Sequence, residues 1–389
     1  MCKKGIIILS VLVFILTAYT QAQVNTYQKI SDTQGNLGAA LDDYAGFGKA
    51  SLSLVKPGGG RLLIVGAPRE DDTGSIYFLD IVADGTVDDQ WKIPSAEGGY
   101  VGSLDAGDDF GASIAQLDDL DNNGVPEIAV GAPGDDDGGT NRGAVWIIFL
   151  NTNYSVKSYQ KISDIQGNLT PSLEDYDYFG RACSAAGDLD FNGFSELAVG
   201  APGDDNGGTV YIHFLNTDGT INVSSQICHG CGDFTGIIEF GDSFGASLTS
   251  LGDLNNDGYP ELAVGAPGDN DWDIDSGAVW IIFLHILGIV DGHQKITVEQ
   301  GNFGYGLDEF SWFGGSLTCP GDLDGDTLPD LFVGEYGWES VWVLYMREDG
   351  MVKTKQTFNI TDVGGSFPDD DYFGYSCASP GDLNGDSTP

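Results

Sequence analysis

Four copies of an acidic nine-residue segment have residue types and a spacing that could bind a cation. Each copy carries oxygen-bearing side chains at positions 1, 3 and 5 and a carboxylate at position 9, and three copies have glycine at position 6. Alternate residues of a tight loop can turn several oxygens toward one point, and glycine readily adopts the left-handed backbone of such a loop. Calcium takes about six to eight oxygen ligands. The segments therefore predict calcium sites.

Each predicted site uses five residues, and the residue at position 7 contributes only its backbone carbonyl. We expect about three to four calcium ions, because the last copy has Thr327 in place of the glycine. The predicted ligands are Asp119, Asp121, Asn123, Val125 and Glu127; Asp188, Asp190, Asn192, Phe194 and Glu196; Asp253, Asn255, Asp257, Tyr259 and Glu261; and Asp322, Asp324, Asp326, Leu328 and Asp330.

These segments begin like an EF-hand loop but lack its glutamate at position 12, and the runs on either side predict strands rather than helices. A single copy would be better explained as a solvated Asp/Asn/Gly turn. Four copies at the same place in a repeat favour calcium. Magnesium fits less well because it tends to keep its waters. Residues 53–61, the equivalent part of the first repeat, have no carboxylate and are expected to bind nothing.

An internal repeat positions these segments. Phe-Gly pairs recur at intervals of 60 to 69 residues, and the first five are followed about 20 residues later by Gly-Ala-Pro or a variant of it. Each unit contains four apolar, β-branched runs separated by turn residues, which predicts four short strands. Such units predict an all-β propeller of four-stranded blades around a central channel. The pairs begin at Phe47, Phe110, Phe179, Phe244, Phe313 and Phe373.

The repeat predicts five complete blades and part of a sixth. The complete blades are expected at about 47–93, 110–162, 179–229, 244–296 and 313–360, and the partial one at 373–389. Residues 27–31 match the fourth segment of a unit, so we expect them to form an outer strand that completes the last blade and closes the ring. Because the sixth unit stops partway, we expect a fragment of a larger propeller.

The combination of Phe-Gly, acidic nonapeptide and Gly-Ala-Pro resembles the FG-GAP repeats of integrin α-subunit heads and of many other surface proteins. The resemblance extends over nearly all of the chain after residue 27. It implies a propeller of seven blades when complete, with calcium on one face and partner binding on the other. Blade five departs from the pattern at Thr327, Glu335 and Tyr336. Because no leg-like domain or membrane span is present, a complete integrin subunit is not expected.

The N-terminus predicts secretion. Lys3 and Lys4 precede an apolar run, and small or polar residues follow as far as Ala22, so residues 1–22 are interpreted as a signal peptide. The apolar run is too short to span a bilayer, which takes about 20 residues. We expect a secreted or cell-surface protein without membrane insertion. Its formal charge of -43 disfavours nucleic acid as a partner.

The sequence contains no pattern typical of catalysis. Four histidines are scattered, and no nucleophile elbow or phosphate loop is present. We therefore expect an adhesion or ligand-binding scaffold for an extracellular protein or carbohydrate, not an enzyme. The alternatives are the non-catalytic propeller of a larger secreted hydrolase and a multivalent carbohydrate-binding protein. Sequons would be glycosylated in a eukaryotic secretory pathway; they are Asn153, Asn168, Asn222 and Asn359.

Three further features have more than one interpretation. Acidic residues after each Gly-Ala-Pro are interpreted as solvated turns in preference to cation or ligand contacts. Aromatic residues before the Phe-Gly pairs are expected to pack between blades in preference to forming a binding surface. Cys228 and Cys231 form either a local disulfide or two thiols, and a metal or redox site is less favoured. The aromatic residues are Tyr44, Tyr176, Tyr178, Phe310, Trp312 and Tyr372.

Overall fold

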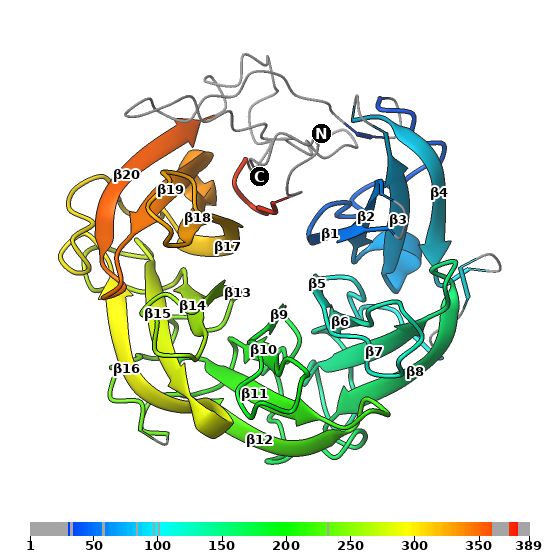
Figure 1. The fold of residues 1–389 in the computed structure, drawn as a ribbon, viewed down its shortest axis with the longest axis horizontal. Helices are drawn as coiled ribbons and strands as arrows, with labels where there is room; N and C mark the ends of the chain where they lie inside the picture. Colours follow the sequence, from blue (N-terminus) through cyan, green and yellow to red (C-terminus); the bar gives the residue numbers. More distant parts are fainter. Residues whose placement is uncertain are drawn as a thin grey trace.

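The computed structural model describes residues 30–31, 34–56, 59–82, 85–95, 98–99, 102–231, 233–359 and 373–379. Within these ranges, twenty strands form five antiparallel sheets, each with four strands in chain order. The sheets stand around a ring, and the first strand of each lies nearest the centre (Figure 1). The predicted propeller of four-stranded blades is therefore confirmed for five blades.

The strands of the five blades have the following bounds. Blade one is β1 (Ser51–Val55), β2 (Arg61–Ala67), β3 (Ser75–Ile81) and β4 (Val87–Ile93); blade two is β5 (Ser113–Gln116), β6 (Ile128–Ala132), β7 (Ala144–Leu150) and β8 (Val156–Ser163); blade three is β9 (Ala182–Ala185), β10 (Leu197–Ala201), β11 (Thr209–Leu215) and β12 (Ile221–Ile227); blade four is β13 (Ser247–Gly252), β14 (Glu261–Ala266), β15 (Ala278–His285) and β16 (Ile289–Ile296); blade five is β17 (Phe313–Gly321), β18 (Asp330–Glu335), β19 (Ser340–Met346) and β20 (Val352–Asn359).

The middle strands of each blade are buried on both faces. All seven residues of β7 and all five of β6 are buried, which fits strands sandwiched between neighbouring blades. The fourth strands lie on the outside, and β8 is exposed along its first half. Because the strands are antiparallel and consecutive, the nonapeptide loops between first and second strands lie at one end of the blades. The connections between second and third strands, and between blades, lie at the other end, here called the opposite face.

The Phe-Gly and Gly-Ala-Pro motifs meet across blade boundaries. A Cβ atom on Gly131 would lie only 1.9 Å from the carbonyl oxygen of Gly180 in the next blade, and the Gly180 backbone itself has a φ of 89°. Each position therefore requires glycine for its own reason. The same approach recurs, at 1.9 to 2.0 Å, between Gly66 and Gly111, Gly200 and Gly245, Gly265 and Gly314, and Gly334 and Gly374.

Serine hydroxyls and buried phenylalanines complete these joints. Ser113 Oγ donates to the Gly180 carbonyl at 2.8 Å, and Ser247 Oγ donates to that of Gly314 at 2.6 Å. Phe110 and Phe179 are fully buried and contact aromatic side chains of their own blades edge-on, at Trp146 and Tyr211. The repeat motif is thus the packing interface of the ring.

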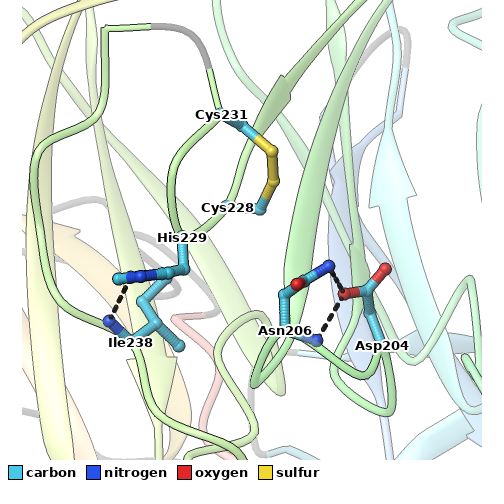
Figure 2. The surroundings of a disulfide bond; sticks show 6 residues. All are labelled: Asp204, Asn206, Cys228, His229, Cys231 and Ile238. Carbon is cyan, nitrogen blue, oxygen red and sulfur yellow. Dashed lines mark hydrogen bonds between the residues drawn. A yellow bond between two sulfur atoms is a disulfide. The ribbon is translucent and has the colours of Figure 1, made fainter.

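Cys228 and Cys231, directly after β12, form a disulfide (Figure 2). The local disulfide is therefore the correct one of the two alternatives. Between the two cysteines, His229 Nδ1 accepts a hydrogen bond from the Ile238 N–H at 3.4 Å. The disulfide closes the first turn of the connection from blade three to blade four, on the opposite face.

Several predictions concern residues outside the described ranges. These residues include the signal peptide and positions 27–29 of the expected closing strand. Only Ile30 and Ser31 of that strand are described. Within the sixth unit, residues 373–379 lie inside the ring (Figure 1). The closing strand, the sixth blade and a total of seven blades stay predictions. Among the described residues, no helix has the length and apolar character needed to cross a membrane.

Candidate metal centres

Each nonapeptide folds into a loop around the carboxylate at its first position. In blade two, Asp119 accepts hydrogen bonds from the backbone N–H groups of Asn123 and Gly124 at 2.9 and 2.7 Å. Asn123 Oδ1 in turn accepts from the Val125 N–H at 2.8 Å. Gly124 has a φ of 88°, as expected for the left-handed turn. The same hydrogen bonds recur around Asp188, Asp253 and Asp322 in blades three, four and five.

The loop brings the predicted acidic ligands together. In blade two, one oxygen from each of Asp119, Asp121 and Glu127 lies within 4.8 Å of the others. The equivalent three carboxylates gather in blades three and five. Blade four has an amide at the third position, where Asn255 Nδ2 donates to Asp257 Oδ2 at 2.9 Å. Each of the four blades thus places three or four acidic side chains and a possible backbone carbonyl around one loop.

The carboxylate at position 9 lies buried beneath each loop. Glu127 Oε2 accepts from the Leu120 N–H, and this hydrogen bond recurs in every copy. Burial, with repulsion from Asp121 and Asp119, raises the pKa of Glu127 to about 7. For the same reasons the pKa rises to about 8 at Glu196 and to about 7 at Glu261 and Asp330. Without a cation, each cluster holds more negative charge than its surroundings stabilise.

Unpartnered buried oxygens show that blades two and four fit a cation. Glu127 Oε1, Asp121 Oδ1 and Glu261 Oε1 are buried without a hydrogen-bond partner. Buried polar atoms are nearly always paired, so such oxygens require another ligand. Calcium fits this all-oxygen set. The position 9 carboxylate of blade five differs, because Asp330 accepts from both Leu323 N–H and Met346 N–H, at 2.8 and 3.1 Å.

Lysines on two fourth strands reach into the loops, which sequence reasoning missed. Lys157 Nζ lies 2.6 Å from Asp121 Oδ2 in blade two. In blade five, Lys353 Nζ lies 2.6 Å from both Asp324 and Asp326. The aligned fourth-strand positions in blades three and four are Asn222 and Asp291. The sequence did contain a signal for these contacts, because each lysine directly follows the first residue of a predicted fourth strand.

A second set of acidic residues follows each Gly-Ala-Pro, and its interpretation as solvated turns is wrong for blades one, two and four. Asp135 and Asp269 are buried, and each shares a lysine with a second carboxylate. Lys161 Nζ lies 2.6 Å from Asp135 and 2.7 Å from Asp137, and Lys295 pairs in the same way with Asp269 and Asp271. In blade one, Lys92 pairs with Glu70 and Asp71. These lysines belong to the Gln-Lys-Ile segments and their weaker variant.

Blade three has no such lysine pair among its described residues. Gln226 stands where blades two and four have Lys161 and Lys295. Asp204 instead accepts hydrogen bonds from the backbone and side-chain nitrogens of Asn206, at 2.9 and 3.0 Å (Figure 2). This copy remains a partly exposed turn, as expected.

The aromatic residues before the Phe-Gly pairs are mostly exposed, so their expected packing between blades is wrong. Tyr44, Tyr176, Tyr178 and Phe310 are exposed. In the five described blades the residue directly before the Phe-Gly pair has left-handed backbone, with a φ of 54° at Tyr178. Phe310, three residues before its pair, is also left-handed, with a φ of 59°. Trp312 is half-buried and stacks on Tyr336 with ring centroids 5.1 Å apart, and Tyr372 lies outside the described residues. The exposed rings lie on the opposite face.

Comparison with known proteins agrees with this architecture. The FG-GAP repeat family matches residues 110–148, 179–213 and 244–282, which run from the Phe-Gly pair into the third strand of blades two, three and four. This chain carries FG-GAP repeats. Each matched FG-GAP repeat includes one nonapeptide loop, whereas the blade-five loop with Thr327 lies outside the matched ranges.

Several integrin alpha chains are similar in sequence to this chain. Integrin alpha-3 of Cricetulus griseus is 31% identical over 242 residues, which cover 62% of this chain and 21% of that protein. Integrin alpha-4 of Xenopus laevis is 31% identical over 191 residues, covering 47% and 17%. Integrin alpha-7 of Homo sapiens is 35% identical over 165 residues, covering 40% and 12%. The chain therefore spans about a fifth or less of the length of these relatives.

Proposed function

We propose that this chain is a secreted or cell-surface calcium-binding propeller that serves as an adhesion or ligand-binding scaffold. The observation that carries the proposal is the fourfold repetition of a loop whose buried carboxylates exceed the positive charge beside them. Similarity to integrin alpha chains supports the adhesive role. No catalytic step is proposed.

Calcium would be held by the residues that each loop already turns inward. Side-chain oxygens come from positions 1, 3, 5 and 9, and the carbonyl comes from position 7. The bound ion would supply the positive charge that buried residues such as Glu127 and Glu261 lack. Blades two, three and four are the stronger sites. Blade five is weaker, because Asp330 is already doubly hydrogen-bonded and Lys353 occupies two of its other carboxylates.

The opposite face is the proposed binding surface. Exposed aromatic side chains gather on its connections, including Tyr176 and Tyr178, whose rings lie 6.4 Å apart. Phe240, Trp272 and Trp338 are exposed on neighbouring connections of the same face. Exposed aromatic rings of this kind provide contact area for proteins and stacking platforms for sugars. We propose an extracellular protein or carbohydrate as the ligand.

Calcium binding is tested by stoichiometry. Titration calorimetry on the intact chain is expected to give about three to four calcium ions, and Asp188→Ala and Asp253→Ala should each remove one. Asp205→Ala, an exposed acidic residue on the opposite face, is the control for lost charge and should remove none. Unchanged stoichiometry in both loop variants would show that the loops are only turns.

The scaffold role is tested by adhesion. Surfaces coated with the purified chain should retain cells in calcium buffer, and the double variant Tyr176→Ser, Tyr178→Ser should weaken retention. Loss of retention after glycosidase treatment of the cells would assign the ligand to carbohydrate, and loss after protease treatment would assign it to protein. Equal retention by a surface without the chain would contradict the adhesive role.

A further inference from the structure

Blade five lacks a lysine at a position where three other blades have one. On the fourth strands of blades one, two and four, this lysine lies directly across from an aromatic residue of the third strand. Its nitrogen lies 5.1 to 5.9 Å from the centroid of that ring and pairs with two carboxylates. Blade five has the aromatic residue, Trp342, but Thr357 faces it. The pairs in the other three blades are Tyr77 with Lys92, Trp146 with Lys161, and Trp280 with Lys295.

A pocket lies at this position of blade five, on the opposite face. Its volume is about 480 Å³, within the range of about 300–1,000 Å³ that is typical of ligand sites. It is formed by the connection before β17, the connection between β18 and β19, and the adjoining ends of β18, β19 and β20. The lining side chains that decide its chemistry are Asp308, Glu335, Trp338, Glu339, Trp342 and Thr357.

This blade-five pocket is negatively charged. Glu335 is buried, and its Oε2 accepts a hydrogen bond from Trp342 Nε1 at 2.8 Å. Burial raises the pKa of Glu335, although hydrogen bonds from the side chains of Ser311 and Trp342 act against it. Asp308 is exposed and Glu339 is half-buried. Among the described residues, none forms an ion pair with these three carboxylates.

One lysine lies near the pocket without neutralising it. Lys355, on β20, has its nitrogen 3.4 Å from the ring centroid of Phe303 and 4.6 Å from that of Trp342. This nitrogen donates to the Tyr305 carbonyl at 2.7 Å and forms no ion pair with a described carboxylate. Burial lowers the pKa of Lys355 to about 8, and the charge of Glu335 only partly offsets this. Lys355 therefore does not take the place of the missing lysine.

We propose that the blade-five pocket binds an ammonium group that a protein partner presents on a lysine side chain. The ammonium would lie over the Trp342 ring and beside the Glu335 carboxylate, as the chain's own lysines lie in the other blades. Ammonium groups form charge-assisted hydrogen bonds with carboxylates and are attracted to the faces of indole rings. A metal ion fits less well, because the groups of three described carboxylates close enough to share one ion do not include these residues. The inference rests on the proposed partner-binding role of the opposite face for the source of the lysine.

The test uses a defined peptide rather than the natural partner. Titration calorimetry compares an acetylated peptide amide that carries one lysine with the same peptide carrying norleucine. The buffer contains calcium and about 0.15 M salt, which screens the general attraction of cations to an acidic chain. We expect the unaltered chain to bind the lysine peptide about 10- to 100-fold more tightly, because charge-assisted hydrogen bonds contribute. Equal binding of the two peptides would overturn the proposal.

Restoring the lysine of the other blades gives the sharpest variant. Thr357→Lys places an ammonium group of the chain itself in the pocket, so the preference for the lysine peptide should disappear. Thr354→Lys adds the same charge to the same strand outside the pocket and should keep the preference. A preference that persists unchanged in Thr357→Lys would show that the peptide binds elsewhere on the acidic surface, which contradicts the proposal.

A second variant keeps the test decisive if Thr357→Lys fails to fold. The double variant Asp308→Asn, Glu339→Gln removes two carboxylates that line the pocket and are not fully buried, and should weaken lysine binding severalfold. Glu348→Gln with Asp349→Asn removes the same two charges from the connection between β19 and β20, at the nonapeptide end, and should leave binding unchanged. Equal effects of the two double variants would contradict the proposal.

Two other ligand classes have their own outcomes. Tighter binding of a neutral methyl glycoside than of the lysine peptide, lost in Thr357→Lys, would assign the pocket to carbohydrate and overturn the proposal. Tighter binding of n-butylamine than of the lysine peptide would assign it to a free amine and contradict a protein partner.

The assay separates this inference from the proposed function. Peptide binding needs neither the natural partner nor cells. If calcium stoichiometry and adhesion behave as proposed but the peptides do not differ, only the blade-five pocket fails. If the peptides differ but the loop variants keep all calcium, the pocket stands and the calcium proposal fails.

Discussion

Blade two contains two acidic clusters that look alike in the sequence and differ in the structure. One is the nonapeptide loop with Asp121 and Glu127, and the other is the pair Asp135 and Asp137 after Gly-Ala-Pro. In the second cluster Lys161 lies between the carboxylates and lowers the pKa of Asp137, although burial still raises that of Asp135. In the first, burial and repulsion raise the pKa of Glu127 to about 7. The difference is whether a buried lysine lies between the carboxylates, because the half-exposed Lys157 contacts Asp121 and leaves Glu127 Oε1 without a partner.

The same contrast recurs in blade four. Lys295 lies between Asp269 and Asp271, whereas Glu261 retains a buried oxygen without a partner. A cluster whose buried carboxylate is paired with a buried lysine is a closed structural joint, and a cluster whose buried carboxylate has no lysine partner is open to an external ion. Asp-rich composition alone does not distinguish the two, because the deciding lysine lies on the fourth strand, some 25 residues away along the chain.

Removal of calcium is expected to have the largest effect, and only through the nonapeptide loops. Each site held at a hundred times its Kd stabilises the folded chain by about 2.7 kcal/mol. Chelation that empties several sites should therefore lower the melting temperature more than any single substitution below. Calorimetric melting with and without a chelator measures this. An unchanged melting temperature would mean that the nonapeptide loops bind no stabilising calcium and do not differ from the lysine-paired clusters in this respect.

Lys161→Met tests the joint that carries its own cation. Removing one partner of a buried ion pair leaves uncompensated charge and typically costs about 3–5 kcal/mol. Lys161 is 9% exposed and faces two carboxylates, so we expect a loss in that range from urea unfolding in calcium buffer. Adding Asp135→Asn and Asp137→Asn should recover much of it. A loss that the two asparagines do not relieve would mean that Lys161 acts through packing alone.

Thr327→Gly tests whether the blade-five loop is limited by its backbone. Thr327 has a φ of 77°, a conformation that costs a residue other than glycine about 1–2 kcal/mol. We expect the variant to be more stable by about 1 kcal/mol and to bind calcium more tightly in blade five. Gly258→Thr, at a φ of 97° with open space around the Cβ position, is the reverse experiment. Similar stability of both variants would show that the loops tolerate either residue.

Lys157→Met is expected to have the smallest effect on stability, although Lys157 lies on the same strand as Lys161. Its side chain is 45% exposed, and exposed ion pairs contribute about 0–1 kcal/mol. Because Lys157 contacts Asp121, its removal should raise calcium affinity in blade two severalfold. Titration calorimetry measures this. A fall in affinity would mean that the lysine positions Asp121 for the ion instead of competing with it.

Much of the fold was predictable from spacing alone. Phe-Gly and Gly-Ala-Pro recur at regular intervals, and the runs between them have the length and composition of strands, so four-stranded blades followed directly. The direction of the acidic side chains in the nonapeptide was also predictable. Alternate positions of a tight loop that contains glycine point their oxygens toward its centre. These features depend on residues close together in the chain.

The failures have two physical causes, which are contact between distant residues and left-handed backbone at residues other than glycine. Asp135 was expected in a solvated turn because its burial depends on Lys161, which approaches from the outer strand. Tyr176 was expected between blades, but left-handed backbone at Tyr176 and Tyr178, with φ of 71° and 54°, accompanies rings that face solvent. The left-handed backbone at the fourth nonapeptide position, with φ of 58° at Phe191, was missed because Phe rarely adopts it.

The joint between Gly131 and Gly180 has a consequence for how such rings can change in length. Each repeat carries a Gly-Ala-Pro half that fits the next repeat and a Phe-Gly half that fits the previous one. A tandem duplication of one repeat length in the gene therefore inserts a blade whose two edges already match both neighbours. Deletion of one repeat length leaves two matching edges in the same way. The number of blades can therefore change by whole repeats without any new kind of contact at the joints. The number is limited by the angle between neighbouring blades that a closed ring requires.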